Sequence, residues 1–259
     1  MRVTILGSGS EGNALLLESD ATSIVVDAGL SHRKLVARLA TLGRGTPSVS
    51  SVLITHGHAD HAAHASIYAT RMGCPVHATA ATLRSLRLRS AVQTHPFIVG
   101  RRLRVGDITV HSRAIPHDAP QVALVFETAL TKIGLVTDLG HVPKGLSRFL
   151  KGCDTLLLES NHDPEMLRVG PYPPAVKRRV ASSLGHLSNE QASDLLADLT
   201  HSPARVVLMH LSETNNSARL ARSSAEAVLG HQGTQLLVAQ QREPMELPYD
   251  GAQQLQLGL

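Results

Sequence analysis

The residues best suited to chemistry stand at 55–61, in the segment Thr-His-Gly-His-Ala-Asp-His. His56 and His58 lie two residues apart on an expected extended turn, so both can reach one ion. Asp60 and His61 open an expected helix and point another way, which suits a second ion. Imidazole and carboxylate together suit Zn²⁺, Mn²⁺ or Fe. The alternative is a His-rich loop that binds nothing, but composition alone gives this pattern in roughly two chains per thousand.

Further polar residues occupy equivalent places along the chain. Asp27, Asp138, Glu159 and His210, like His56, stand at or just past the C-terminal end of a β-like run. Ligands bind at that edge in open α/β sheets. The sequence therefore predicts one shared site built from several strand ends.

Apolar runs alternate with helical patterns, which predicts the α/β class. The expected strands are Arg2–Leu6, Ala14–Glu18, Ser23–Asp27, Ser51–Thr55, Ile108–His111, Ala123–Phe126, Lys132–Thr137, Thr155–Glu159 and Arg205–His210. The expected helices run from the cap Ser31 to Gly43 and over Asp60–Met72, Asn189–Leu199 and Ala218–Leu229. We expect one domain over residues 1–240 and a loose, Gln-rich tail over 241–259.

Composition bounds the class of protein. The 259 residues are 42% hydrophobic and 18% charged, which excludes a disordered chain. No apolar run approaches the ~20 residues of a membrane span, and the start lacks the apolar core of a signal peptide. Two cysteines, Cys74 and Cys153, cannot form a disulfide framework and are expected to pack in the core, so the cytoplasm is the expected compartment. A net charge of +4 permits nucleic acid as a partner without establishing it.

The 55–61 motif, the strand before it and Asp27 upstream resemble the metallo-β-lactamase superfamily. That resemblance implies a four-layer αββα sandwich with two divalent metal ions at one edge, Zn²⁺ first and Mn²⁺ or Fe as alternatives. The implied ligands are His56, His58 and His117 for one ion, Asp60, His61 and His210 for the other, and Asp138 as a bridge between them. Asp27 would orient a ligand histidine through its ring N–H. Taken alone, His117 or His210 could equally be an ordinary solvated histidine.

Four segments together resemble the YycJ (WalJ) group of that superfamily: residues 8–13, 158–163, 185–189 and 210–216. The match extends from the first strand to about Ala218. The resemblance implies a 5′-to-3′ DNA exonuclease that uses a metal-bound hydroxide, and it allows a homodimer. The chain is also similar to ribonuclease Z proteins, which implies that His186 is an added acid and Glu159 its orienting partner. Asp60 would serve catalysis as well as ligation. The alternative for His186 is a structural hydrogen bond at a helix start.

Substrate contacts are predicted in two kinds of segment. Ser8, Ser10 and Asn13 stand in a Gly-rich loop that could bind phosphate through its N–H groups, although a simple hairpin turn explains it as well. Three basic clusters could follow a DNA backbone or could be solvated faces. They are Lys177-Arg178-Arg179, then Arg84, Arg87 and Arg89, then Arg101, Arg102 and Arg104.

Two other functions stay open at this point. The same ligands would serve a hydrolase of a small thioester, ester or lactone, because the metals activate water for either substrate. A non-catalytic binding protein is disfavoured because no ligand position is lost. The salt dependence of activity distinguishes these two enzymes, because binding of DNA weakens steeply as salt rises and binding of a neutral small substrate does not.

Overall fold

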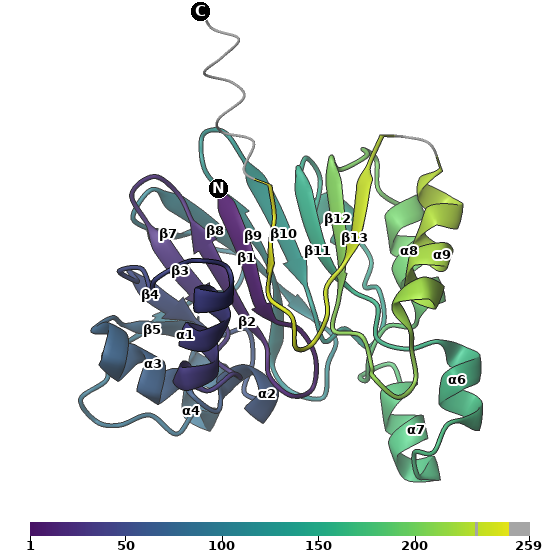
Figure 1. The fold of residues 1–259 in the computed structure, drawn as a ribbon, viewed down its shortest axis with the longest axis horizontal. Helices are drawn as coiled ribbons and strands as arrows, with labels where there is room; N and C mark the ends of the chain where they lie inside the picture. Colours follow the sequence, from purple (N-terminus) through teal and green to yellow (C-terminus); the bar gives the residue numbers. More distant parts are fainter. Residues whose placement is uncertain (231–232, 249–259) are drawn as a thin grey trace, which may run out of the picture.

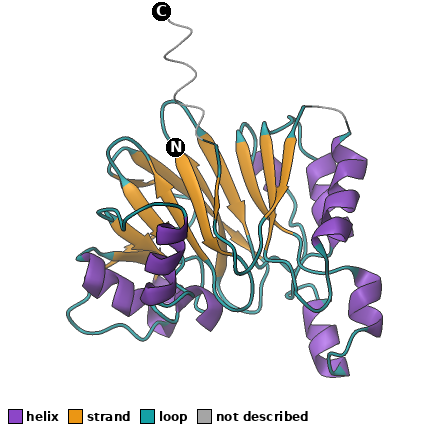
Figure 2. Ribbon diagram, viewed as in Figure 1, coloured by secondary structure: helices purple, strands orange, loops and turns teal. Residues whose placement is uncertain are grey.

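Two seven-stranded sheets pack face to face, and helices cover their outer faces (Figures 1 and 2). The computed structural model describes residues 1–230 and 233–248. The first sheet has the order β14-β1-β2-β3-β4-β5-β6, and the second has the order β13-β12-β11-β10-β9-β8-β7. This is the expected four-layer αββα sandwich. No helix in the described part of the chain is long and apolar enough to cross a membrane.

The strands of the first sheet are β1 Arg2–Gly7, β2 Ala14–Glu18, β3 Ser23–Val26, β4 Ser51–Leu53, β5 Val76–Thr79, β6 Thr94–Phe97 and β14 Met245–Glu246. Those of the second are β7 Leu103–Val105, β8 Ile108–Ile115, β9 Gln121–Glu127, β10 Lys132–Val136, β11 Thr155–Glu159, β12 Arg205–Met209 and β13 Gln235–Val238. The helices are α1 His32–Thr41, α2 Ala59–Ala62, α3 Ala65–Met72, α4 Ala80–Ser85, α5 Leu146–Phe149, α6 Pro164–Val169, α7 Pro174–Val180, α8 Asn189–Ala197 and α9 Ala218–Leu229.

Each sheet is antiparallel at one side and parallel at the other. Strands β1 to β3 pair antiparallel and β3 to β6 pair parallel, while β7 to β10 pair antiparallel and β10 to β13 pair parallel. The parallel strands direct several C-terminal ends to one edge of the sandwich. Both sheets therefore deliver side chains to the same place.

The apolar runs are continuous because both faces of the central strands are buried. In β2, Leu15 and Leu17 face the core between the sheets, whereas Leu16 packs under α1 and α3. In β11, Leu157 faces the same inter-sheet core, and its neighbours pack under α8 and α9. Side chains alternate across a strand, so one run fills two layers of core.

All nine expected strands form, with ends shifted by a few residues. Five strands were not expected, and each is short: β5, β6, β7, β13 and β14. The expected helix over Asp60–Met72 is interrupted at His64, because the His64 N–H donates to the Ala28 carbonyl instead of continuing the first helix. Cys74 and Cys153 are buried in the cores beneath the helices, as expected.

The expected loose tail is wrong for residues 241–248. Strand β14 pairs with β1, and Leu247 is buried in the inter-sheet core. Arg44 forms ion pairs with Glu18 and Glu246 and so holds β14 on the sheet. A two-residue strand lacks the periodicity that a sequence pattern needs, but its backbone pairing and one apolar side chain hold it. The rest of the expected tail, residues 249–259, lies outside the described residues.

Candidate metal centre

All seven predicted ligands and the two predicted catalytic partners, Glu159 and His186, lie at one edge of the sandwich. Asp27, His56, Asp138 and His210 follow the ends of β3, β4, β10 and β12, and Glu159 ends β11. His117 comes from the loop after β8, and His186 from the loop before α8. The parallel pairing of these strands places their ends side by side.

The first group joins His56, His58 and His117, whose ligand atoms lie within 4.8 Å of one another. The Nδ1–H of His117 donates to the Gly185 carbonyl at 3.1 Å, so its Nε2 faces the group, 3.2 Å from His58 Nδ1. His56 Nε2 is buried and has no hydrogen-bond partner among the described residues. Burial lowers the pKa of His56 to about 2, so the ring is neutral, as a metal ligand must be.

The second group joins Asp60, His61, Asp138 and His210 within the same 4.8 Å limit. His61 Nε2 lies 3.0 Å from Asp138 Oδ2. Asp60 Oδ2 lies 3.6 Å from both His61 Nε2 and His210 Nε2. Although burial raises the pKa of Asp60, its contacts with His210 and His61 lower it to about 2, so the carboxylate is charged.

Asp138 stands between the two groups. Its Oδ1 is 4.0 Å from His117 Nε2 in the first group, and its Oδ2 faces His61 in the second. The carboxylate is almost fully buried, and despite that burial the neighbouring imidazoles of His210 and His61 hold its pKa well below the usual range. One carboxylate with an oxygen toward each group can bridge two ions.

The donor set fits two divalent cations. His56 Nε2 and His210 Nε2 are both buried without a hydrogen-bond partner in the described part of the chain, which is costly unless each meets a cation. Buried carboxylates at Asp138 and Glu159 add negative charge that cations would neutralise. Burial alone would lower the pKa of His210, but Asp138, Asp60 and Glu159 raise it to about 10. A cation bound to His210 Nε2 would take the place of that proton beside the same carboxylates.

Asp27 supports two ligands from behind. Its Oδ2 accepts from His61 Nδ1–H at 2.7 Å, so His61 Nε2 faces the second group. There it lies 2.8 Å from Asn13 Nδ2 and 3.0 Å from Asp138 Oδ2. Its Oδ1 accepts from the Thr55 N–H at 2.8 Å and from the Thr55 hydroxyl at 3.0 Å. That hydroxyl in turn accepts from His56 Nδ1–H at 3.1 Å. The contact with His61 is the one that the predicted orienting role of Asp27 requires, and Thr55 links Asp27 to a second histidine.

Among the described residues, three that are not glycine have a left-handed backbone conformation, and all three belong to this site. They are Asp27 at φ 62°, Asp138 at φ 54° and His210 at φ 56°. This conformation costs an ordinary residue about 1–2 kcal/mol. Each residue follows the end of a strand, where the chain turns sharply at the shared edge, which explains why the strain occurs here.

Glu159 and His186 form the predicted pair. Glu159 Oε1 accepts from His186 Nδ1 at 2.8 Å and from His210 Nδ1 at 3.1 Å. Its other oxygen accepts the backbone N–H groups of Leu139 and Leu187. Burial lowers the pKa of His186, but the Glu159 carboxylate outweighs burial and raises it, so the ring retains a proton more readily.

The Gly-rich loop plays a different part from the one expected. Ser8 is buried, and its hydroxyl accepts the backbone N–H of His210 at 2.8 Å. Asn13 is buried too, and its amide contacts Gly9, the Asp60 carbonyl and His61. Both side chains therefore support the ligands and do not face a substrate, which corrects their assignment as substrate contacts. Ser10 alone of the three lines the cleft.

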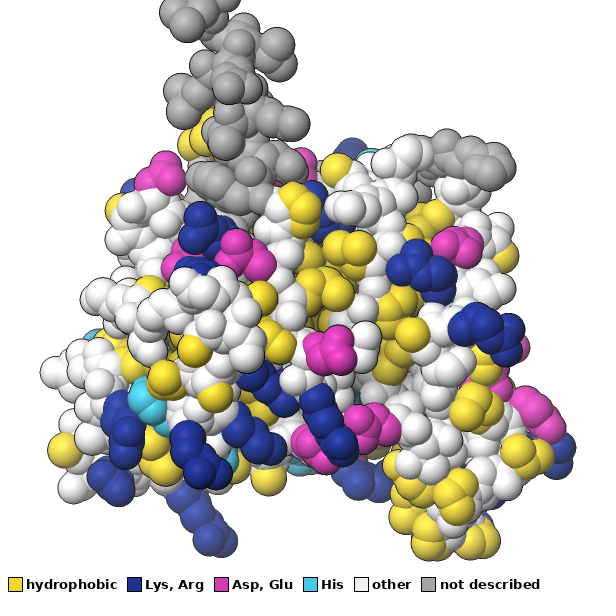
Figure 3. Space-filling model, viewed as in Figure 1, with side chains coloured by type: hydrophobic (Ala, Val, Ile, Leu, Met, Phe, Trp, Pro, Cys, Tyr) yellow, Lys and Arg dark blue, Asp and Glu magenta, His cyan; other side chains and the backbone are white. Residues whose placement is uncertain are grey.

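A cleft of about 290 Å³ opens over the site. Its lining residues are Ser10, His58, Asp60, Asp138, Asn161, Tyr172, Arg179, Val180, His186, His210, Leu211 and Ser212. Arg179 of α7 thus brings one predicted basic cluster to the mouth. Arg104 instead donates to the Gly106 carbonyl in the turn before β8, at the opposite end of that strand from His117. Figure 3 shows Lys and Arg side chains along the lower edge of the molecule and a group of hydrophobic side chains at the lower right, where Figure 1 places α7.

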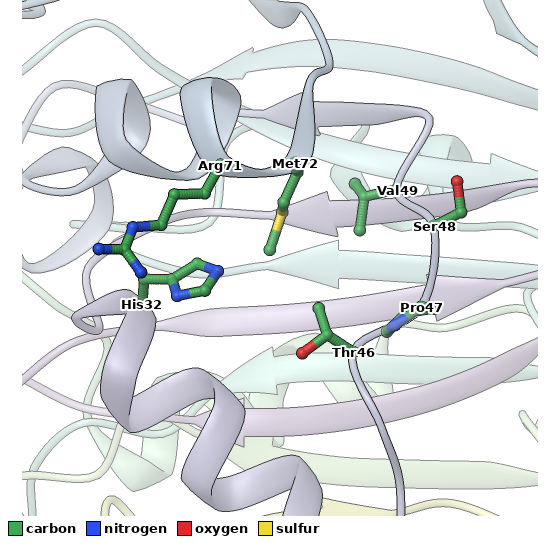
Figure 4. Close-up of a pocket in the computed structure, with 7 residues that line it drawn as sticks. All are labelled: His32, Thr46, Pro47, Ser48, Val49, Arg71 and Met72. Atoms are coloured by element: carbon green, nitrogen blue, oxygen red, sulfur yellow. The ribbon is translucent and has the colours of Figure 1, made fainter.

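A larger hollow of about 500 Å³ lies elsewhere, between the start of α1, the end of α3 and the loop 46–49 (Figure 4). The imidazole of His32 and the guanidinium of Arg71 line this hollow, and none of the predicted metal ligands lines it. Size therefore does not locate the chemistry in this protein; the convergent histidines and carboxylates do.

The sequence did not predict that three of the segments that resemble the YycJ (WalJ) group contact one another. Ser160 Oγ donates to Asn189 Oδ1 at 2.6 Å, and Asn216 Nδ2 donates to the Ser160 carbonyl at 2.8 Å. Asn161 Nδ2 donates to the His210 carbonyl at 2.9 Å. The segments 158–163, 185–189 and 210–216 thus form one buried polar network behind His186 and His210. Their Asn and Ser content was visible in sequence, but their mutual contacts were not.

Fold and site together define a class of protein. The model of the β-lactamase superfamily domain matches residues 22–211, and the chain belongs to the metallo-β-lactamase superfamily. Within it the chain is a YycJ-like protein. It is 36% identical over 239 residues to exodeoxyribonuclease YycJ of Bacillus anthracis, covering 90% of each chain. It is 34% identical over 243 residues to exodeoxyribonuclease WalJ of Streptococcus pneumoniae serotype 2, covering 88% of this chain and 90% of the relative.

Among solved structures, the metallo-β-lactamase fold protein YhfI of Bacillus subtilis is similar with a TM-score of 0.72 at 18% identity, over 95% of this chain and 98% of that one.

Proposed function

We propose that this metal-dependent hydrolase is a two-metal phosphodiesterase that degrades DNA from a 5′ end. The observation that carries the proposal is the Glu159–His186 pair beside two complete ligand groups. Hydrolysis of a carbonyl substrate does not call for such a pair in the same way. The names of the YycJ and WalJ relatives support DNA as the substrate.

His56, His58 and His117 would hold one ion, and Asp60, His61 and His210 the other, with Asp138 between them. The donor set favours Zn²⁺, with Mn²⁺ or Fe as alternatives. When bound, two such ions supply an activated water and neutralise charge on a phosphate.

His186 lines the cleft, and its Nδ1 is occupied by Glu159, so Nε2 is the atom that faces the substrate. A proton on Nε2 can pass to the leaving oxygen as the bond to phosphorus breaks. Glu159 keeps the ring in that orientation and raises its pKa. Asp60 belongs to the second group and also lines the cleft, so this metal ligand lies next to the space that a substrate would occupy.

The test is hydrolysis of 5′-labelled duplex DNA with Zn²⁺ or Mn²⁺ at low and moderate salt. Wild-type protein should release nucleotides and lose activity as salt rises, and Asp60→Ala should empty one metal site and abolish turnover. His186→Ala should reduce turnover by about 10²–10⁴-fold with its metal content intact. A wild-type protein that binds two metals and leaves DNA whole would point to a small thioester, ester or lactone instead.

The homodimer and the cytoplasmic location stay predictions. Light scattering of the purified protein and cell fractionation would check them.

A further inference from the structure

Each ligand histidine except His58 already has an identified support on its second ring nitrogen. Thr55 holds His56, Asp27 holds His61, the Gly185 carbonyl holds His117 and Glu159 holds His210. Such contacts fix the tautomer and the direction of a ligand ring.

Asp118 provides the missing support. Its Oδ1 lies 3.2 Å from His58 Nε2, the other ring nitrogen from the Nδ1 that contacts His117. The same oxygen lies 3.3 Å from His117 Nε2. Asp118 is not one of the residues whose ligand atoms converge with His56 and His117. It therefore lies against the first group, in contact with His58 and His117, without belonging to that set of converging ligand atoms.

Arg179 holds Asp118 in turn. The Arg179 Nε and the terminal NH2 nitrogen both lie 2.7 Å from Asp118 Oδ2. Arg179 belongs to α7, a helix with no buried residue, and its side chain lines the cleft. A chain of charge-assisted contacts thus runs from the exposed helix α7 to a ligand of the first group.

We propose that Asp118 is a positioning residue that fixes His58 for the first ion and at the same time holds the Arg179 guanidinium over the cleft, where it contacts a substrate phosphate. The phosphate contact rests on the proposed function, whereas the support of His58 does not. Arginine suits this place because its planar fork can hold a carboxylate and still offer N–H donors to a phosphate.

The first test measures Zn²⁺ binding alone, by competition with a chromophoric chelator and without DNA. Asp118→Ala should weaken one of the two bound Zn²⁺ ions by about 10–100-fold, the usual effect of removing such a support. Asp118→Asn should recover much of that affinity, because its amide oxygen still accepts from His58 Nε2–H. Circular dichroism should show both variants folded.

Two outcomes would overturn the support of His58. Wild-type affinity for both ions in Asp118→Ala would show that His58 needs no such contact. An equal loss in the Ala and Asn variants would make Asp118 a direct ligand, since an amide cannot replace a coordinating carboxylate charge.

The second test compares Arg179→Gln with Arg178→Gln, which removes the same charge from an exposed neighbour on α7. Arg179→Gln should raise the KM for DNA more than Arg178→Gln does, with kcat less affected, and should weaken the first Zn²⁺ by less than Asp118→Ala does. Equal KM values for the two variants would remove the phosphate contact. If wild-type protein binds Zn²⁺ as expected but cleaves no DNA, the proposed function fails while the role of Asp118 stands.

Discussion

Individual residues at this site tolerate strain because neighbours far away in sequence hold them. The His210 N–H would point into a buried region without an acceptor, and the Ser8 hydroxyl supplies one across 202 residues of chain. Asp27 is held by its own N–H, which donates to the Leu53 carbonyl at 2.8 Å. Left-handed backbone at such residues persists where contacts of this kind over-determine it.

Ser8→Ala should therefore behave as a change to the metal centre. Leaving the buried His210 N–H unpaired costs about 1–3 kcal/mol of folding free energy. His210 should also shift and weaken Zn²⁺ binding, while the KM for DNA stays close to wild type. Thermal unfolding, metal analysis and kinetics would measure these three quantities.

Ser10→Ala is the matched control, since Ser10 lies in the same loop but is exposed at the cleft. Its stability should stay within about 0.5 kcal/mol of wild type. A Ser8→Ala protein with unchanged stability and metal content, but a raised KM, would restore Ser8 as a substrate contact.

Elements with strong patterns were predictable, and elements held by their neighbours were not. Strand β11 is apolar on both faces, so its sequence identifies it. Strand β6 contains Pro96 at a sheet edge and exposes three of its four residues, so its pairing with β5 depends on the rest of the sheet. The 55–61 motif and the strand ends indicated one shared metal site, and the resemblance to the metallo-β-lactamase superfamily supplied the remaining ligands. Ser8 and Asp118 act through contacts that no local pattern records.

Close packing between elements sets the position of α2. A Cβ on Gly29 would lie 1.7 Å from the Asp60 carbonyl oxygen and 2.8 Å from the Asn13 nitrogen. Gly29→Ala must therefore push α2 away, at a cost of about 1–3 kcal/mol from overpacking. Displacing Asp60 should also weaken the second ion, and a Zn²⁺ titration together with denaturant unfolding would show both effects.

Gly45→Ala provides the comparison, because a Cβ there meets nothing within 4 Å. It should be neutral or should stabilise by up to about 1 kcal/mol through the unfolded chain. Equal behaviour of the two variants would mean that α2 moves freely and that its contact with the Gly29 loop does not position Asp60.

At the scale of the whole molecule, the site lies on the seam between the two sheets. His56, His58, Asp60 and His61 come from the half that carries β1 to β6. His117, Asp138 and His210 come from the half that carries β7 to β13. Neither ligand group is complete within one half, so each ion would tie the two halves together.

Chelation should therefore lower the stability of the whole chain. A ligand at 100 times its Kd stabilises the folded state by about 2.7 kcal/mol per site. For a chain of this size, removing one such site should lower Tm by several degrees, at roughly 2–4 °C per kcal/mol. Calorimetry with and without a chelator would measure the shift, and the Asp60→Ala protein should show a smaller one. An unchanged Tm after complete metal removal would mean that the ions do not join the halves.

The division of the ligands between the two halves also fixes the order in which the site is completed during synthesis. The ribosome releases the segment with the four N-terminal ligands long before it has made Asp138 and His210. Until those residues are made, neither ligand group is complete together with its bridging carboxylate, so we expect a nascent chain to have no metal-dependent hydrolase activity. The metal centre is therefore completed only after the second sheet has been synthesised and has packed against the first.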